Sequence, residues 1–183
     1  MNIFYLSENA QECAKMHLSK HVTKMCIEYP QLMSTAHRVL DGEEYTDLTD
    51  NGRRIKRWRM EDTVMESTLY KASHINHPSA IWCRENRQNY VWLYRMWFYL
   101  LQEYTYRYGR QHECAKLRAA LYLTPEKIKE GEFFPPTPAM PDHIKIPGNS
   151  LASYHNYYNI SKRGFASWQG KVNSRPTPEW YNV

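Results

Sequence analysis

Hydrophobic residues recur with a helical period through most of the chain. After the short extended stretch "IFYL", the pattern predicts a first helix from about Asn9 to Tyr29, with Ser7 or Asn9 available as its cap. Proline lacks the amide proton that a helix interior requires, so Pro30 is expected to kink this helix or to open the next one, "PQLMSTAHRVL".

A second long helix is predicted from Pro78 to Gly109. Proline favours the first turn of a helix and glycine its end, and the apolar positions between them are dense enough for the central helix of a bundle. These positions include Trp82, Val91, Tyr94, Trp97, Phe98 and Leu101. Shorter helices are predicted for "RQHECAKLRAALYL" and for "SLASYHNYYNISKRGFASWQGK".

Two stretches lack this pattern. Residues 41–57 are polar and contain the turn signal Asn51-Gly52. Residues 123–148 hold six of the ten prolines and are expected to form an irregular connection, not a linker between domains. The sequence thus predicts an all-α fold, in which residues 1–183 form a single-domain helical bundle with a long central helix and a proline-rich connection.

Composition narrows the choice of partner. A net charge of +5 modestly favours a polyanion, and 15 tyrosines with 6 tryptophans leave rings for stacking on bases. The four cysteines form no CxxC pair, which indicates reduced thiols. Since the sequence shows neither an apolar span of eighteen residues nor a signal peptide, we expect a soluble protein of the cytoplasm, or of the host cytoplasm if phage-encoded, with no membrane partner.

One stripe of the first predicted helix carries mixed charge. At 100° per residue, His17, His21, Lys24 and Glu28 share one side, next to an apolar face. A solvated face with supporting pairs four residues apart explains most of this stripe. Glu28 fits that explanation less well, because a carboxylate at the predicted helix end, before Pro30, opposes the helix dipole. A functional role for Glu28 therefore stays open.

A metal site is a weaker interpretation of the same residues. Cys13, His17 and His21 are spaced four apart, and "HINH" and "HEC" add further candidate ligands. None of these spacings matches a standard zinc pattern. We therefore expect no metal and no organic cofactor.

The segment "RRIKRWRM", residues 53–60, concentrates positive charge directly after the Asn-Gly turn. It is either a solvated loop or a surface that neutralises phosphates while an indole stacks or wedges. The basic residues around Trp58 are Arg53, Arg54, Lys56, Arg57 and Arg59.

The stretch "HVTKMCIEYPQL" resembles the first catalytic helix of the phage pyrimidine-dimer DNA glycosylases, also called phage endonuclease V. In that family a histidine is followed seven residues later by the catalytic glutamate, then an apolar residue and proline, as in His21, Glu28, Tyr29 and Pro30. Residues 75–109 resemble the family's long middle helix. The ending "KVNSRPTPEWY" resembles its terminal motif, with Lys171, Arg175, Pro176, Thr177, Trp180 and Tyr181.

The resemblance implies a DNA glycosylase with AP-lyase activity, in which an N-terminal α-amine attacks C1′ of a damaged pyrimidine nucleoside. An α-amine has an ordinary pKa of about 7.7–8.0, against about 10.4 for lysine, so it is the readier nucleophile. Because Asn2 is too bulky for usual removal of the initiator, this amine would be that of Met1. The family's arginines beside the catalytic glutamate are replaced by Ile27 and Gln31.

From the resemblance, Glu28, Met1 and His21 are the expected catalytic residues. Double-stranded DNA is the expected partner of a protein for which a monomer is favoured, with contacts from Lys20, Lys24, Gln31, Arg53, Arg54, Lys56, Arg57, Lys171, Arg175, Trp180 and Tyr181. Two alternatives remain open: a base-modifying enzyme on the same scaffold that never cleaves the strand, and a non-catalytic nucleic-acid-binding protein.

Overall fold

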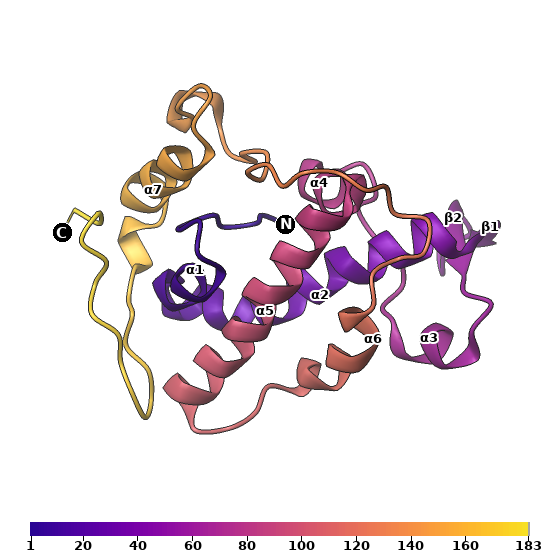
Figure 1. Ribbon diagram of the computed structural model, residues 1–183, viewed down its shortest axis with the longest axis horizontal. Coiled ribbons are helices and arrows are strands. Elements are labelled where there is room, and N and C mark those ends of the chain that lie inside the picture. Colours follow the sequence, from indigo (N-terminus) through magenta and orange to yellow (C-terminus); the bar gives the residue numbers. More distant parts are fainter. Residues whose placement is uncertain (183) are drawn as a thin grey trace.

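Two long helices cross near the centre of the molecule. In the computed structural model, which describes residues 1–182, these are α2 (Ser19–Asp41) and α5 (Arg87–Tyr108), and α1 packs against α5 (Figure 1). The protein is mostly helical, and its core holds the fully buried indoles of Trp82 and Trp97. The shorter helices of the described part are α1 (Ala10–Met16), α3 (Thr63–Thr68), α4 (Pro78–Glu85), α6 (Arg118–Tyr122) and α7 (Ser150–Ser161).

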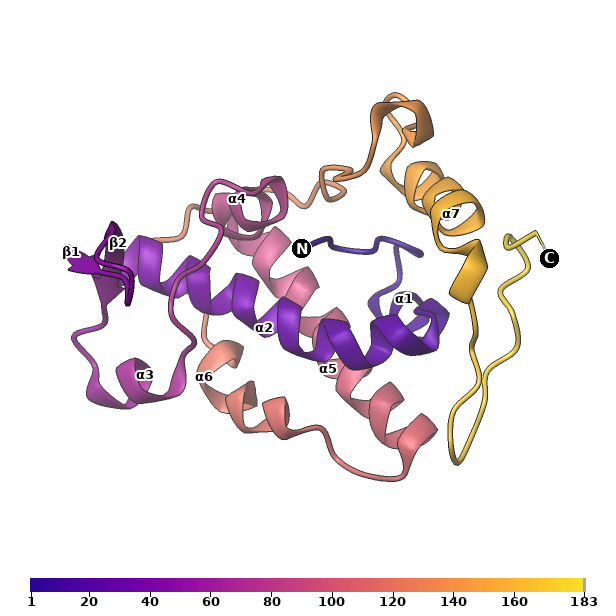
Figure 2. The same cartoon turned by 180° about the vertical axis from the view of Figure 1, so that it is seen from behind.

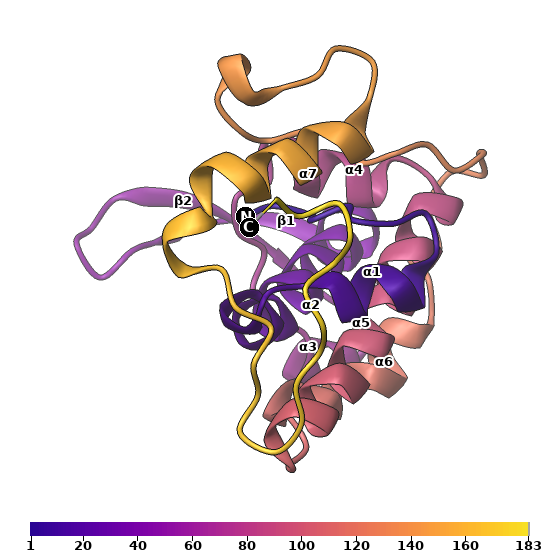
Figure 3. The ribbon, with the colours of Figure 1, turned by 90° about the vertical axis from the view of Figure 1, so that its left-hand side faces the viewer.

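A β-hairpin corrects the all-α prediction. Strands β1 (Glu43–Leu48) and β2 (Arg54–Arg59) pair antiparallel, with Glu43 opposite Arg59 and Leu48 opposite Arg54. Gly52 adopts φ 72° in the connecting turn, the left-handed conformation that an Asn-Gly pair supplies. The hairpin continues from the C-terminal end of α2 and projects from the body of the molecule (Figure 3).

The first predicted helix has different ends in the structure. The chain leaves helical geometry at His17 and Leu18, so that α1 and α2 are separate, and α2 then runs through Pro30 to Asp41. Pro30 cannot donate to the carbonyl of Cys26, four residues earlier. The indole Nε1 of Trp97 donates to that oxygen instead, at 3.1 Å, which replaces the hydrogen bond that proline cannot make.

The second predicted helix is also divided. α4 ends at Glu85 and α5 begins at Arg87, because Asn86 is extended (φ −151°) and its side-chain oxygen caps the amide of Asn89 at 2.9 Å. Gly109 ends α5 in the left-handed conformation, as predicted (φ 70°).

The proline-rich connection is irregular, as predicted. Residues 123–148 contain one short 3₁₀ turn, Asp142–Ile144, and cross the molecule on the way to α7 (Figure 2). The indole of Trp82 donates to the carbonyl of Phe134 at 2.9 Å, which fixes part of this connection to α4. No helix in residues 1–182 combines the length and apolar character needed to cross a membrane.

Arg38 anchors the segments that follow α2. Its side chain is 3 % exposed and donates to the carbonyl oxygens of Trp58, Glu66, Leu69 and Tyr70 and to the Glu66 carboxylate. One buried guanidinium thereby holds β2, α3 and the chain after α3 against α2.

The hydrogen bond from Trp97 to the Cys26 carbonyl predicts that the effect of changing Trp97 depends on Pro30. Trp97→Phe should lower the free energy of unfolding by about 2 kcal/mol or more, because a buried carbonyl loses its donor and the smaller ring leaves a void. The loss should be smaller when Pro30→Ala is also present, since the new amide can donate to Cys26. Urea unfolding of the wild type, both single variants and the double variant measures this coupling; equal losses in both backgrounds would mean that the indole bond does not compensate for proline.

Candidate functional site

Glu28 lies in the middle of α2, one turn after Lys24. Since α2 continues to Asp41, the expected conflict between Glu28 and a helix C-terminus does not occur. Its side chain is 17 % exposed and pairs with the Nζ of Lys24 at 3.1 Å, while the Lys24 side chain is 65 % exposed. Glu28 is therefore a sheltered carboxylate at the edge of a solvent-facing surface.

His77 lies close enough to Glu28 for the carboxylate to act on it. The chain before α4 is held along α2, because the Thr35 hydroxyl accepts the amide of Ser73 at 3.2 Å. Burial lowers the pKa of His77, the charges of the Met1 α-amine and His74 lower it further, and Glu28 raises it. The pKa of this imidazole thus depends on the charge of the chain terminus and on that of the candidate catalytic carboxylate.

The tautomer of His77 follows from its role as the N-cap of α4. Its Nδ1 accepts the amide proton of Ser79 at 3.1 Å, so in the neutral ring the proton resides on Nε2. The Ser79 hydroxyl in turn donates to the Met1 carbonyl at 3.4 Å. The start of α4 therefore positions both His77 and the first residue, and the N-terminus lies near α4 in Figures 1 and 2.

His21 occupies a different environment from Glu28. The side chain is buried, its ring stacks on Phe4 at 4.0 Å, and its Nδ1 is 2.7 Å from the hydroxyl of Tyr158. Burial, followed by the charges of His17, Lys162 and Lys24, lowers its pKa to about 2. A histidine that stays neutral inside the protein supports packing of α7 on α2, and these contacts give no support to the expected catalytic role.

Positive charge gathers where α2 begins and α7 ends. The Nζ of Lys20 is 4.7 Å from the centre of the Phe165 ring, and that of Lys162 is 4.3 Å from the Tyr157 ring. Lys24 and Lys162 both act on the pKa of His21, so they belong to the same region. We call Lys20, Lys24 and Lys162 the basic corner; through the Lys24 pair it borders Glu28.

Four further expected basic contacts lie on the hairpin, at the opposite end of α2. Arg53, Arg54 and Lys56 are exposed, and Lys56 pairs with Glu44 at 2.8 Å. Arg57 is half-buried. From Glu28 to the end of α2 is 13 residues, or roughly 20 Å at 1.5 Å per residue, so the hairpin begins well away from Glu28.

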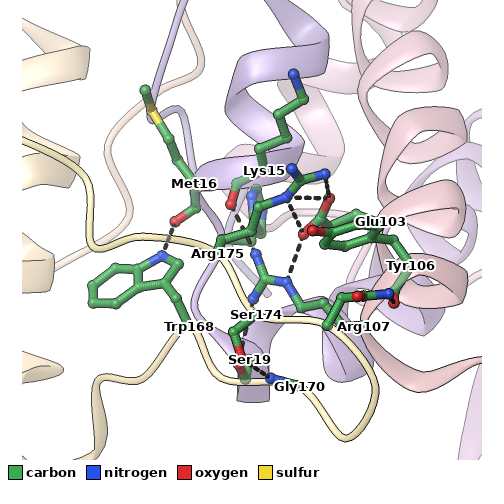
Figure 4. A network of polar contacts seen from close by, with 12 residues as sticks. Lys15, Met16, Ser19, Glu103, Tyr106, Arg107, Trp168, Gly170, Ser174 and Arg175 are labelled. Carbon is green, nitrogen blue, oxygen red and sulfur yellow. Dashed lines mark hydrogen bonds and ion pairs between the residues drawn. The ribbon is translucent and has the colours of Figure 1, made fainter.

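Arg175 makes contacts within the protein and is 28 % exposed. Its guanidinium donates to both carboxylate oxygens of Glu103, at 3.0 to 3.2 Å, and lies 4.0 Å from the centre of the Tyr106 ring (Figure 4). The fully buried Arg107 donates to the same carboxylate at 2.6 Å. Arg175 therefore attaches the C-terminal segment to α5, and its expected phosphate contact stays a prediction.

The aromatic pair near the C-terminus is likewise engaged within the protein. Trp180 stacks on His155 at 3.9 Å with a 5° interplanar angle, and Tyr181 packs edge-on against Trp168. Both residues are half-buried and take part in the packing of the C-terminal segment. Lys171 is exposed on the loop before Arg175, and Gln31 is half-buried on α2 with its carbonyl accepting the Thr35 hydroxyl at 2.8 Å.

The candidate metal ligands have protein partners. Cys13 Sγ donates to the Phe4 carbonyl at 3.2 Å, and His17 contacts the Cys13 carbonyl and the Tyr29 hydroxyl, both at 2.7 Å. Within residues 1–182, no cluster of three His, Cys, Asp or Glu side chains could hold a metal ion.

The residues that sequence reasoning missed come from distant parts of the chain. His77 and Ser79 belong to the predicted capping region, and Lys162 and Phe165 follow the last helix; no local signal relates any of them to Glu28. Comparisons of the chain with protein-family models, curated proteins and solved structures found no match.

Burial of His17 predicts a loss of stability in acid. Burial lowers its pKa from 6.5 to about 4, so between these pH values the unfolded chain binds a proton that the folded protein does not. The stability due to neutral His17 is therefore complete above pH 6.5 and is lost as the pH falls toward 4. His17→Gln should flatten the dependence of the unfolding free energy on pH by about 1.4 kcal/mol per pH unit in this range.

Urea unfolding at a series of pH values measures that slope, and exposed His143→Gln serves as the control. An identical slope in wild type and His17→Gln would show that His17 is not the responsible group.

Proposed function

We propose that the protein is a DNA N-glycosylase that acts on damaged or modified pyrimidines and uses the α-amine of Met1 as its nucleophile. The observation that carries the proposal is that Ser79, at the start of α4, holds the Met1 carbonyl, next to His77, on whose pKa the charges of the chain terminus and of Glu28 both act. The buried segment of residues 3–6 holds the terminus in this region, and an α-amine with a carboxylate is a suitable pair for covalent catalysis.

The proposed chemistry follows from this pair. The neutral amine attacks C1′, the bond from C1′ to the base breaks, and the base leaves with its bonding electrons and takes up a proton. Glu28 accepts a proton from the attacking nitrogen and returns it to O4′ as the C1′–O4′ bond opens, which leaves an iminium between Met1 and the sugar. Removal of a C2′ proton then expels the 3′ phosphate and cleaves the strand.

Access to C1′ requires that the nucleotide leave the stack or that the duplex bend. The basic corner is suited to hold the flanking phosphates, since Lys24 pairs with Glu28 and the ammonium groups of Lys20 and Lys162 lie against aromatic rings. Phe165, which is 37 % exposed between Lys20 and Lys162, offers a face on which an unstacked base can rest. The hairpin would contact phosphates about 20 Å further along the duplex.

A covalent trap tests the nucleophile. Borohydride should reduce the iminium formed with abasic-site DNA, and mass spectrometry should locate the adduct on Met1. Glu28→Gln should reduce trapping at least about a hundredfold, the usual contribution of a positioned acid–base group, with little change in folding. Glu12→Gln is the matched control, because Glu12 also pairs with a lysine on a helix surface, at 2.8 Å.

The outcomes separate the alternatives. An adduct on an internal lysine would support the lyase activity but show that lysine, not Met1, is the nucleophile. Base release without an adduct would indicate a glycosylase in which Glu28 activates water. Tight DNA binding with neither reaction would reject the glycosylase and leave a binding protein or a base-modifying enzyme.

The salt dependence of DNA binding tests the two basic surfaces. Replacing Lys20, Lys24 and Lys162 by Ala should flatten the slope of log K against log salt by roughly two to three units, at about 0.9 per lost phosphate contact. Arg53, Arg54 and Lys56 replaced by Ala remove the same charge and should flatten the slope similarly. Only the variant of the basic corner should slow single-turnover base release at saturating DNA. Equal rates in the two variants would show that the basic corner does not contact the reacting nucleotide.

A further inference from the structure

A cavity of about 520 Å³ opens at the C-terminal end of α2, away from the basic corner. Its walls come from the end of α2, the chain between β2 and α3, α3 itself and the chain after α6. Met60, Met65 and Leu123 supply its apolar surface.

Four carboxylates and no lysine or arginine line this cavity. They belong to Asp41, Glu61, Asp62 and Glu126, in a protein whose net charge is +5. Asp41 accepts the amides of Glu126 and Lys127 at 2.9 and 3.0 Å, which fixes its position on the wall. Such a surface attracts cations and repels the anionic partner proposed for the basic corner.

His37 gives a second, independent reason to expect a ligand. Its side chain is 3 % exposed and lines the cavity. Nε2 is 2.9 Å from the Tyr90 hydroxyl, which donates its own proton to the Leu121 carbonyl, and 3.1 Å from the Leu123 carbonyl, which can only accept. In the neutral ring Nε2 therefore carries the proton and Nδ1 has a free lone pair. No described residue donates to Nδ1, and the Asp41 carboxylate that faces it at 3.9 Å is an acceptor too.

A donor that reaches both of these acceptors, which face the cavity, would satisfy them together. An ammonium group has three N–H donors and a positive charge, so it can donate to the Nδ1 lone pair and to Asp41 together. The remaining carboxylates then suit further positive charge on the same molecule.

The arrangement of the acidic groups suits an extended organic cation better than a metal ion. None of the carboxylate groups in the described chain comes together with two other ligands as a metal ion would require. The acidic groups are instead distributed around apolar walls, a pattern that suits ammonium groups joined by methylene segments.

We infer that this cavity binds a linear aliphatic diamine or polyamine, with one ammonium group between His37 and Asp41 and another at Glu61 and Glu126. The site is separate from the Glu28 region, and the inference does not rest on the proposed function.

Calorimetric titration of the whole protein with 1,4-diaminobutane and with spermidine tests the inference. Butylamine and Mg²⁺ serve as ligand controls, since each lacks either the second ammonium group or the methylene chain. The diamine should bind more tightly than both. The ¹⁵N resonance of His37 Nδ1 should move when it accepts the new hydrogen bond.

Glu61→Gln with Glu126→Gln should weaken diamine binding roughly tenfold, the sum of two exposed ion pairs. Both residues are exposed, so the fold should survive. Glu85→Gln with Glu132→Gln removes the same charge at exposed positions outside the cavity and should leave affinity within about twofold.

Three results would overturn the inference: no binding of either amine, equal weakening by the two double variants, or Mg²⁺ competing as well as the diamine. The second and third would show that only diffuse counterion attraction acts here. Binding without any change at His37 Nδ1 would overturn the assigned position of the first ammonium group.

Discussion

The architecture depends on a buried extended segment that pairs with no strand. Residues 3–6 are at most 4 % exposed, so their backbone polar groups need partners from side chains. The amide of Phe4 donates to the Tyr29 hydroxyl at 3.2 Å, that hydroxyl donates to Nε2 of His17, and Nδ1–H of His17 donates to the Cys13 carbonyl. In this chain of hydrogen bonds each group donates to the next, and neutral His17 both accepts and donates a proton. The same residue therefore stabilises the break between α1 and α2 and the N-terminal segment.

This segment turns an ordinarily frayed terminus into a positioned group. Cys13 Sγ bonds both to the Phe4 carbonyl and to the Leu6 amide, and Ser79 holds the Met1 carbonyl, so the first six residues are fixed from both ends. The proposed nucleophile therefore does not have to be ordered by its substrate, which lowers the entropy that the reaction must supply. His17 and His21 make internal contacts that hold this part of the fold, whereas the pKa of His77 responds to the charges of the chain terminus and of Glu28.

The sequence predicted the helical regions well and their ends less well. Helical period, Pro78 and Gly109 locate α4 and α5, because propensity and capping are local properties. The continuity of α2 through Pro30 was not predictable, since the donor that compensates for proline is Trp97, 67 positions later in the chain. The hairpin was missed although Asn51-Gly52 is a hairpin signal, because its strands are mostly polar and show little core alternation. The candidate site residues show the same limit of local signals. The neighbouring residues in the sequence indicate Glu28, but its relation to His77 exists only in the folded chain.

The two ends of α2 carry charge against the direction of its own dipole. Its first turn contains Lys20 and no acidic residue, and its last residue is Asp41, whereas the macrodipole favours anions at the start and cations at the end. Arg38 in the last turn does not offset this, because its charge is paired with Glu66. Each unfavourable placement costs about 0.3–1 kcal/mol at an exposed site. A polyanion on the basic corner and a polycation in the acidic cavity would each reverse part of that cost. The two proposed sites thus lie at opposite ends of one helix, and each favours a ligand of the charge that the helix dipole favours at that end.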